Sequence, residues 1–294
     1  LNVTAEIVRM TADVAGVSEK EATRMIILGL KDMAGVCPPR FIRQLVEALR
    51  KKYPDLILHY HRHYTDGLFV PSVGAAAQAG GQAEAIAADL TVEEDRQLVF
   101  EQVTQAHGQI DVLVNNAGAG WYGYFTDMTW QTAREILSLN ISATVQFTLL
   151  FLKRMRERGS GHIINIGSVS GGLPSQGIAI YGATKSFLDN FTTSLYRELS
   201  GTHLRVSVVR AGPVLTEFCE TAADRQGGMH VPTEHTGVTA ELVAQRVWSL
   251  LRWPRRVIYV PAWLAVTPLV ENSFGWLIDR LGPLLLKRQK QSNQ

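Results

Sequence analysis

Short apolar runs alternate with amphipathic segments along most of the chain. Apolar runs bounded by turn residues predict buried strands, and apolar positions that recur every three or four residues predict helices. This alternation is typical of an α/β fold, in which each strand is followed by a crossover helix and the sheet is parallel. The predicted strands lie within residues 25–35, 56–64, 81–89, 110–114, 162–167, 204–210 and 256–260.

Three polar side chains around the strand predicted at 162–167 suit proton transfer. Ser168 follows the apolar run HIINIG, and Lys185 follows Tyr181 by four residues. If Tyr181 opens a helix, this step places both side chains on one face. A lysine ammonium beside a phenol favours the phenolate, so we expect the pKa of Tyr181 to be lowered toward the working pH. The alternative is a chance Tyr–Lys pair on a helix.

Composition narrows the function classes. Of the 294 residues, 46% are hydrophobic and 19% are charged, as in ordinary globular proteins, and the net charge of +2 gives no argument for a nucleic-acid partner. Cys37 and Cys219 lie far apart and outside any CxxC pattern, which implies a reducing compartment or indifference to it. No secretory signal pattern opens the chain, so we expect a cytoplasmic protein. Leu1 in place of Met predicts a fragment, a processed product or an engineered chain.

From residue 81 onward, the order and spacing of several motifs resemble the short-chain dehydrogenase/reductase family. The matching features are ADLT at 88–91, NNAG at 115–118, Asn140, Ser168, Tyr181, Lys185 and the GPVLT segment that ends at Thr216. The resemblance implies a doubly wound, Rossmann-like parallel sheet. It also implies an oxidoreductase that uses NAD or NADP to interconvert an alcohol and a carbonyl.

The resemblance assigns catalytic roles to four residues. Tyr181 would be the general acid/base, and Lys185 would lower its pKa and hold the nicotinamide ribose. Ser168 would hydrogen-bond the substrate carbonyl or hydroxyl. Asn140, at the expected end of a helix over 129–139, would position a water that links Lys185 to solvent, or would merely cap that helix.

The same resemblance assigns cofactor contacts. Asp89 would reach the adenine, or would merely cap the following helix, for which Thr91 is the expected N-cap. The backbone of Asn116, Ala117 and Gly118 would lie along the cofactor, because small residues allow a flat ligand to approach closely. Thr216 would contact the nicotinamide carboxamide.

Residues 25–80 carry a second resemblance. KDMAG at 31–35, a helix, and LHYHRHYTDG at 58–67 resemble the carboxyltransferase barrel of biotin-dependent carboxylases. In that family the matching lysine is carbamylated and binds a divalent metal. The resemblance makes Lys31, His61 and His63 weak candidate metal ligands, and the alternative is polar side chains at a strand end.

We therefore predict a hybrid chain. A helical segment covers residues 1–24, a TIM-barrel-derived βαβα unit covers 25–80, and a dehydrogenase core with an apolar lid covers 81–294. Both kinds of βαβα unit supply two parallel strands with right-handed crossovers. We accordingly expect one doubly wound sheet with strand order 3-2-1-4-5-6-7, in which strands 1 and 2 are the foreign ones.

The glycine-rich turn TGxxxGxG, with which the dehydrogenase family binds the pyrophosphate, is not found before residue 81. The corresponding turn reads KDMAGVCPPRF, in which Gly35 is the one glycine. Pro38 and Pro39 have no N–H group to donate to phosphate oxygens. Three functions stay open: an oxidoreductase, a catalytically silent hybrid or scaffold, and a metal-dependent carboxyltransferase fragment.

The C-terminal segment is apolar, with tryptophans and a basic end. Its longest charge-free run, 257–270, is too short to span a membrane. We expect a substrate-pocket lid or a dimer contact, with peripheral membrane contact as the alternative. An apolar alcohol or ketone is the expected small-molecule substrate, and a homo-oligomer is expected because the helices around Asn140 and Tyr181 resemble the family's dimer face. The candidate pocket residues are Trp121, Tyr122, Phe125, Leu173 and Phe218.

Overall fold

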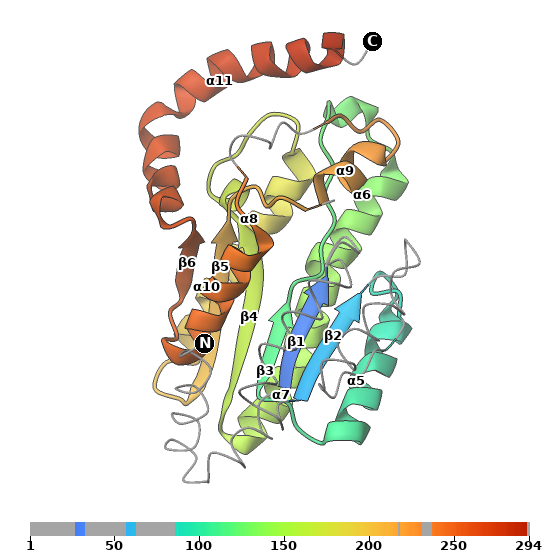
Figure 1. The fold of residues 1–294 in the computed structure, drawn as a ribbon, viewed down its shortest axis with the longest axis vertical. Helices are drawn as coiled ribbons and strands as arrows, with labels where there is room; N and C mark the ends of the chain where they lie inside the picture. Colours follow the sequence, from blue (N-terminus) through green and yellow to red (C-terminus); the bar gives the residue numbers. More distant parts are fainter. Residues whose placement is uncertain are drawn as a thin grey trace.

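The computed structural model describes residues 27–32, 57–62, 86, 88–216, 218–230 and 237–292. The described elements form the α/β arrangement that the alternating pattern predicts (Figure 1). The strands are β1 (Ile27–Asp32), β2 (Ile57–Arg62), β3 (Val112–Asn115), β4 (Gly161–Ser168), β5 (Leu204–Ala211) and β6 (Val257–Val260). The α-helices are α5 (Glu93–His107), α6 (Trp130–Leu137), α7 (Ala143–Arg158), α8 (Ala179–Glu198), α9 (Phe218–Asp224), α10 (Ala240–Arg252) and α11 (Thr267–Ser292).

Four parallel strands form the main sheet, in the order β3-β4-β5-β6. This order reproduces the last four positions of the predicted sheet. The strands β1 and β2 pair in a separate two-stranded parallel ladder, with β1 next to β3 (Figure 1). Within the described residues the two ladders are not hydrogen-bonded to each other, so the prediction of one continuous sheet is corrected.

The strand predicted at 81–89 is not found in the part of that segment that the structure describes. Residues 86, 88 and 89 have no strand pairing. The carboxylate of Asp89 accepts hydrogen bonds from the backbone N–H and the hydroxyl of Thr91, at 2.9 and 2.8 Å, so the chain turns here before α5 begins. The N-cap of α5 is Val92, so the prediction of Thr91 at that position is also wrong.

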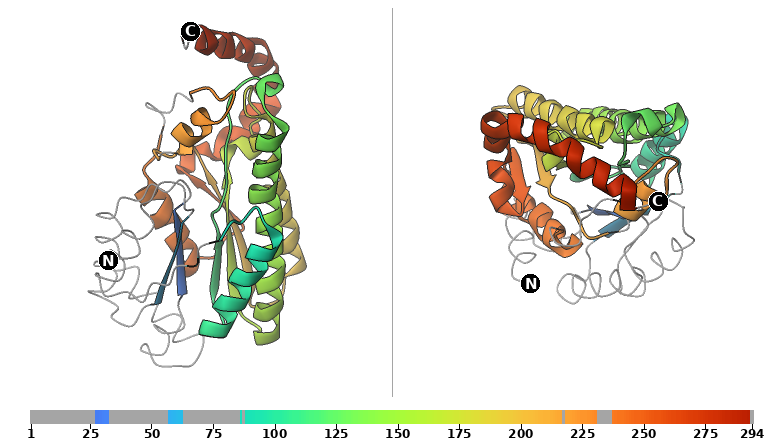
Figure 2. Two further views of the ribbon diagram at one scale, coloured as in Figure 1. Left: turned by 90° about the vertical axis from the view of Figure 1, so that its right-hand side faces the viewer. Right: turned by 90° about the horizontal axis from the view of Figure 1, so that it is seen from above.

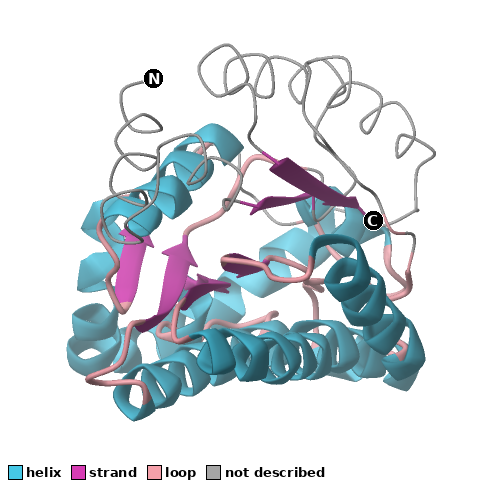
Figure 3. Cartoon of the chain, turned by 90° about the horizontal axis from the view of Figure 1, so that it is seen from below, coloured by secondary structure: helices cyan, strands magenta, loops and turns pink. Residues whose placement is uncertain are grey.

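Helices cover both faces of the main sheet (Figures 2 and 3). Successive side chains of a strand point to opposite faces. Ile163 of β4 accordingly packs with Met155 of α7, whereas the adjacent Ile164 packs with Leu250 of α10. The apolar run of β4 is therefore a central strand that is buried on both sides.

A single long helix passes from residue 130 to residue 158, and it does not end at Asn140 as expected. A π-helical turn, Ser138–Ser142, joins α6 to α7. Among the described residues, this is the one helix that is long and apolar enough to cross a membrane. Its buried side chains, Ile136 and Phe147 among them, belong to the main hydrophobic core, which accounts for its apolar character.

The C-terminal apolar segment forms α11, a helix of 26 residues. It follows β6 and runs over the end of the molecule at which the strands terminate (Figure 1). Of the predicted divisions of the chain, 1–24 lies outside the described residues, and 25–80 is represented only by the backbones of β1 and β2.

Candidate active site

The candidate catalytic residues lie at the carboxyl ends of the parallel strands, where ligands bind in doubly wound sheets. Ser168 is the last residue of β4, and it is in register with Ala211, the last residue of β5. Ala211 is in turn in register with Val260 at the end of β6. Helix α8 packs on β4 and β5 and begins two residues before Tyr181, as the sequence predicts.

Ser168, Tyr181 and Lys185 come together. The hydroxyl of Ser168 lies close enough to the phenol of Tyr181 to favour the phenolate and so lower its pKa. Ser168 also accepts hydrogen bonds from the backbone N–H and the hydroxyl of Ser170, at 3.2 and 2.9 Å. The ammonium nitrogen of Lys185 lies 5.6 Å from the centre of the Tyr181 ring. The structure thus brings a phenol, a hydroxyl and an ammonium group close together.

The electrostatics of this group differ from the prediction. Burial raises the pKa of Tyr181 to about 12, although the nearby hydroxyl of Ser168 acts in the opposite direction. The ammonium of Lys185 donates to the carbonyl oxygen of Ile166 at 2.8 Å. Burial lowers the pKa of Lys185 itself to about 8, although the carboxylate of Asp189 acts in the opposite direction.

Asp189 and Arg210 form a buried ion pair that sequence reasoning missed. The Nε of Arg210 in β5 donates to Oδ1 of Asp189 in α8 at 3.0 Å, and its Nη1 donates to the hydroxyl of Tyr259 in β6. Burial raises the pKa of the Asp189 carboxyl, and Arg210 partly offsets that effect. Within the described residues, Oδ2 of Asp189 has no hydrogen-bond partner. One signal was available, because Asp189 lies one helical turn beyond Lys185.

Asn140 links two parts of the site. Its side chain is fully buried, and Oδ1 accepts from the backbone N–H of Ala119 at 2.7 Å. Its Nδ2 donates to the carbonyl oxygen of Ala119 at 3.0 Å and to the hydroxyl of Thr184 at 2.9 Å. Both N–H groups of the Asn140 amide therefore donate hydrogen bonds to protein atoms. Asn140 holds the loop after β3 against α8, and the alternative of a helix cap is wrong.

The loop after β3 presents its backbone at the same end of the sheet. Asn116 and Ala117 are partly exposed, and Gly118 is buried. A Cβ on nearby Gly120 would lie 2.7 Å from the ring of Phe218, so side-chain-free backbone is required for this close approach. Glycine at position 120 therefore allows Phe218 to pack directly on the loop.

Two further predicted cofactor residues flank this loop. Thr216 is partly exposed, and its hydroxyl accepts from the backbone N–H of Phe218 at 3.4 Å. Asp89 is exposed, and its carboxylate holds the turn before α5. Its carboxylate thus shapes that turn, whether or not it also contacts a ligand.

The predicted pocket residues divide into different environments. Phe218 lies beside Tyr181, with ring centroids 5.6 Å apart. Trp121 is buried in the main core and donates to the carbonyl oxygen of Gln226, so it supports the loop rather than lining an open pocket. Phe125 is 60% exposed. Leu173 is partly exposed on the segment between Ser168 and α8, and burial raises the pKa of Tyr122.

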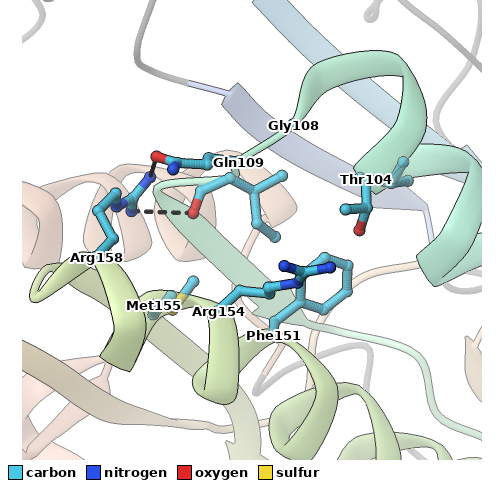
Figure 4. Close-up of a pocket in the computed structure, with 9 residues that line it drawn as sticks. Thr104, Gly108, Gln109, Phe151, Arg154, Met155 and Arg158 are labelled. Atoms are coloured by element: carbon cyan, nitrogen blue, oxygen red, sulfur yellow. Dashed lines mark hydrogen bonds between the residues drawn. The ribbon is translucent and has the colours of Figure 1, made fainter.

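A small cavity lies at the opposite end of the sheet, where α5 and α7 terminate (Figure 4). Its volume is about 10 Å³, enough for at most one water molecule. Arg158 closes it by donating to the side chain of Gln109 and the carbonyl oxygen of Ile110. The cavity therefore has no room for a substrate.

The structure describes two of the three candidate metal ligands, and it describes those two only by their backbones. Lys31 and His61 are cross-strand partners in the β1–β2 ladder, and His63 lies outside the described residues. Among the residues whose side chains are described, no group of three or more His, Cys, Asp or Glu could hold a metal ion. The glycine-poor turn after β1 also lies outside the described part of the chain.

The chain is similar to known proteins in both sequence and fold. The chain is 34% identical to carbonyl reductase family member 4 of Xenopus tropicalis over 180 residues, which are 61% of this chain and 75% of that protein. It is 31% identical to the ketoacyl reductase HetN of a Nostoc species over 184 residues, which are 60% of this chain and 63% of that protein. A short-chain dehydrogenase from Sphingobium yanoikuyae in complex with NADPH has the same fold, with a TM-score of 0.69 and 23% identity over 86% of this chain and 95% of that one.

The family description "short chain dehydrogenase" matches residues 63–227, more than half of the chain. This match begins at residue 63, before the expected boundary at 81. It therefore overlaps the end of the segment 25–80 that was predicted to be barrel-derived, so a barrel origin for all of that segment is not supported. The protein belongs to the short-chain dehydrogenase family of oxidoreductases.

Proposed function

We propose that the protein is an NAD(P)-dependent oxidoreductase that interconverts an alcohol and a carbonyl, with Tyr181 as the acid/base. The observation that carries this proposal is the convergence of the Ser168 and Tyr181 side chains beside the buried ammonium of Lys185. Two hydroxyl groups converge on one point, and a carbonyl oxygen at that point would accept a hydrogen bond from each.

Reduction of a ketone uses these groups in a definite order. With its pKa raised to about 12, Tyr181 is protonated at neutral pH and is a proton donor. The nicotinamide, when bound, supplies a hydride to the carbonyl carbon. As negative charge develops on the carbonyl oxygen, Ser168 donates a hydrogen bond to it and Tyr181 gives it a proton. Lys185 then stabilises the phenolate by its positive charge.

The residues at the site fit the nicotinamide end of the cofactor. Within the described residues, the ammonium of Lys185 uses one N–H group, on Ile166, and has two more to donate to ribose hydroxyls. The backbone of Asn116, Ala117 and Gly118 would lie along the cofactor, and Thr216 would donate to the carboxamide. Asp89 would reach the adenine. Solved members of this fold include complexes with NADPH and NAD, which supports the assignment.

An apolar carbonyl compound is the substrate class that we propose. Phe218 packs against Tyr181, so the substrate group next to the carbonyl would contact an aromatic ring. Relatives are named as carbonyl reductases and ketoacyl reductases, which is consistent with a ketone. A homo-oligomer stays a prediction, as does the origin of residues 25–80.

The experiment is a titration of the purified protein with NADH and with NADPH, followed by nicotinamide fluorescence. Micromolar binding of either cofactor would support the proposal. No binding at millimolar cofactor would contradict it and would favour the catalytically silent hybrid, since the glycine-rich turn is missing from the sequence. Leu149→Ala, an exposed change on α7, is the matched control and should bind like the unaltered chain.

A further inference from the structure

Exposed large apolar side chains gather at the end of the molecule that carries the site. Fifteen such side chains are found in the described residues, and ten of them follow the carboxyl ends of β3, β5 and β6. We call these ten the site-end apolar surface. They are Phe125, Trp130, Leu215, Trp263, Val266, Leu269, Phe274, Trp276, Leu277 and Leu281. Soluble monomers rarely expose large apolar surfaces without a partner.

Helix α11 contributes five of these ten side chains. Leu269 and Trp276 are spaced at i and i+7, and Phe274, Leu277 and Leu281 at i, i+3 and i+7 form a neighbouring row, with Ser273 and Arg280 exposed between the two rows. Trp276 is 64% exposed and Leu269 is 67% exposed. An amphipathic helix with tryptophan and leucine on its free side is typical of segments that lie in a membrane interface.

The other side of α11 holds the helix against the site. The amide of Gln176 donates to the carbonyl oxygen of Ile278 at 3.2 Å. A Cβ on Gly172 would lie 3.9 Å from Pro268. Gln176 and Gly172 both belong to the segment between Ser168 and Tyr181. The apolar side of α11 therefore points outward beside the candidate active site.

Charge favours a lipid surface over a second copy of the chain. After Asp279 the sequence contains Arg280, Lys287, Arg288 and Lys290 and no acidic residue. Basic residues that follow an amphipathic segment are attracted to anionic head groups. A second copy would offer the same positive charge. The exposed tryptophans at 130, 263 and 276 are also the residue type that is enriched where lipid meets water.

We propose that the site-end apolar surface docks this protein on an anionic membrane, with the candidate active site facing the lipid. Docking rests on the surface alone, whereas delivery of an apolar substrate from the membrane also rests on the function proposed above. The apolar side of α11 enters the interface, and the basic end of the chain contacts the head groups. An apolar ketone dissolved in the lipid then reaches Tyr181 without crossing water.

The test is co-sedimentation of the full chain with vesicles of phosphatidylcholine alone and of phosphatidylcholine with phosphatidylserine. We expect binding to the anionic vesicles, a shift of tryptophan emission to shorter wavelength, and weaker binding in high salt. The double change Leu269→Glu with Trp276→Glu should weaken binding at least tenfold. Trp253→Glu is the matched control, because Trp253 is 59% exposed but precedes β6 at the opposite end of the sheet, and it should leave binding unchanged.

Two further measurements distinguish a loss of membrane docking from a loss of folding or catalysis. Thermal unfolding and turnover of a water-soluble ketone should be the same for the double variant and the unaltered chain, so a fault in folding or catalysis is recognised as such. Equal vesicle binding by both chains, or no binding by the unaltered chain, overturns the proposal. If light scattering shows a dimer that the double change converts to a monomer, with no vesicle binding, the surface belongs to a second copy instead.

Discussion

The ammonium nitrogen of Lys185 lies 5.6 Å from the centre of the Tyr181 ring and 2.8 Å from the carbonyl oxygen of Ile166. The four-residue step along α8 brings the two side chains together. Burial acts on both in the direction of the neutral form, because it raises the pKa of Tyr181 to about 12 and lowers that of Lys185 to about 8. At neutral pH the pair is therefore a cation beside a protonated phenol.

The buried charge of Lys185 should make stability depend on pH in the alkaline range. Folding lowers its pKa from 10.5 to about 8, so between these values the unfolded chain binds more protons than the folded chain. The cost of the buried charge is fully present below about pH 8 and is relieved as the pH rises to 10.5. At about 1.4 kcal/mol per pH unit, the relief is roughly 3 kcal/mol.

The comparison chain for this effect is Lys185→Met, which carries no charge to titrate. Urea unfolding of both chains at several pH values should show the unaltered chain gaining stability relative to the variant as the pH rises through this window. Other titrating groups cancel in the difference. A difference that stays constant with pH would show that Lys185 has an ordinary pKa in the folded protein.

The stability losses on removing Asp189 and on removing Arg210 should not be additive, because the two side chains form one ion pair. Asp189→Asn leaves a largely buried guanidinium without its carboxylate, and such a loss costs about 3–5 kcal/mol. The double change Asp189→Asn with Arg210→Leu removes both charges and should cost less than the two single changes together. Urea unfolding of the four chains measures this coupling, and strictly additive costs would contradict it.

Adjacent glycines offer a matched test of the packing beneath the site. A Cβ on Gly171 would lie 2.6 Å from Oδ2 of Asp189 and 2.8 Å from the backbone of Lys185, whereas a Cβ on Gly172 meets nothing closer than 3.9 Å. Gly171→Ala should therefore destabilise the fold by about 1–3 kcal/mol and displace α8. Gly172→Ala should change stability by less than about 0.5 kcal/mol. Thermal unfolding of both variants decides the matter, and equal melting temperatures would refute the close contact.

Removal of the Asn140 side chain should loosen the loop after β3. Asn140→Ala leaves the buried N–H and carbonyl groups of Ala119 without partners, and each such group costs about 1–3 kcal/mol. We expect a loss of stability and weaker cofactor binding together. The control is Asn190→Ala, at an exposed position of α8, which should alter neither quantity. A stable Asn140→Ala chain with weakened turnover alone would instead favour the water-positioning role.

The alternating pattern predicted the central strands well, and the Tyr–Lys spacing predicted that both side chains lie on one helix. The predicted strand at 162–167 became Gly161–Ser168, and the Tyr–Lys spacing placed both residues on α8 beside Ser168. Both features depend on local periodicity, which a sequence displays directly.

Features that depend on tertiary contacts were not visible in that pattern. The helix continues through Asn140, and the side chain of Asn140 is hydrogen-bonded to Ala119, which is distant in sequence. Nothing near Arg210 in the sequence indicates that a charged residue of a central strand pairs with Asp189. The pKa of Tyr181 depends on how deeply the surrounding elements bury it, so its direction was predicted wrongly.

The most direct test of the account is the turnover of Tyr181→Phe. Oxidation of NADH or NADPH in the presence of an apolar ketone would be followed by absorbance for the unaltered chain, for Tyr181→Phe and for Tyr196→Phe, a control at an exposed position of the same helix. We predict that Tyr181→Phe loses a factor of about 10²–10⁴ in rate with cofactor binding unchanged, and that the control retains full activity. A Tyr181→Phe chain as active as the unaltered protein would contradict the role of Tyr181 as the proton donor.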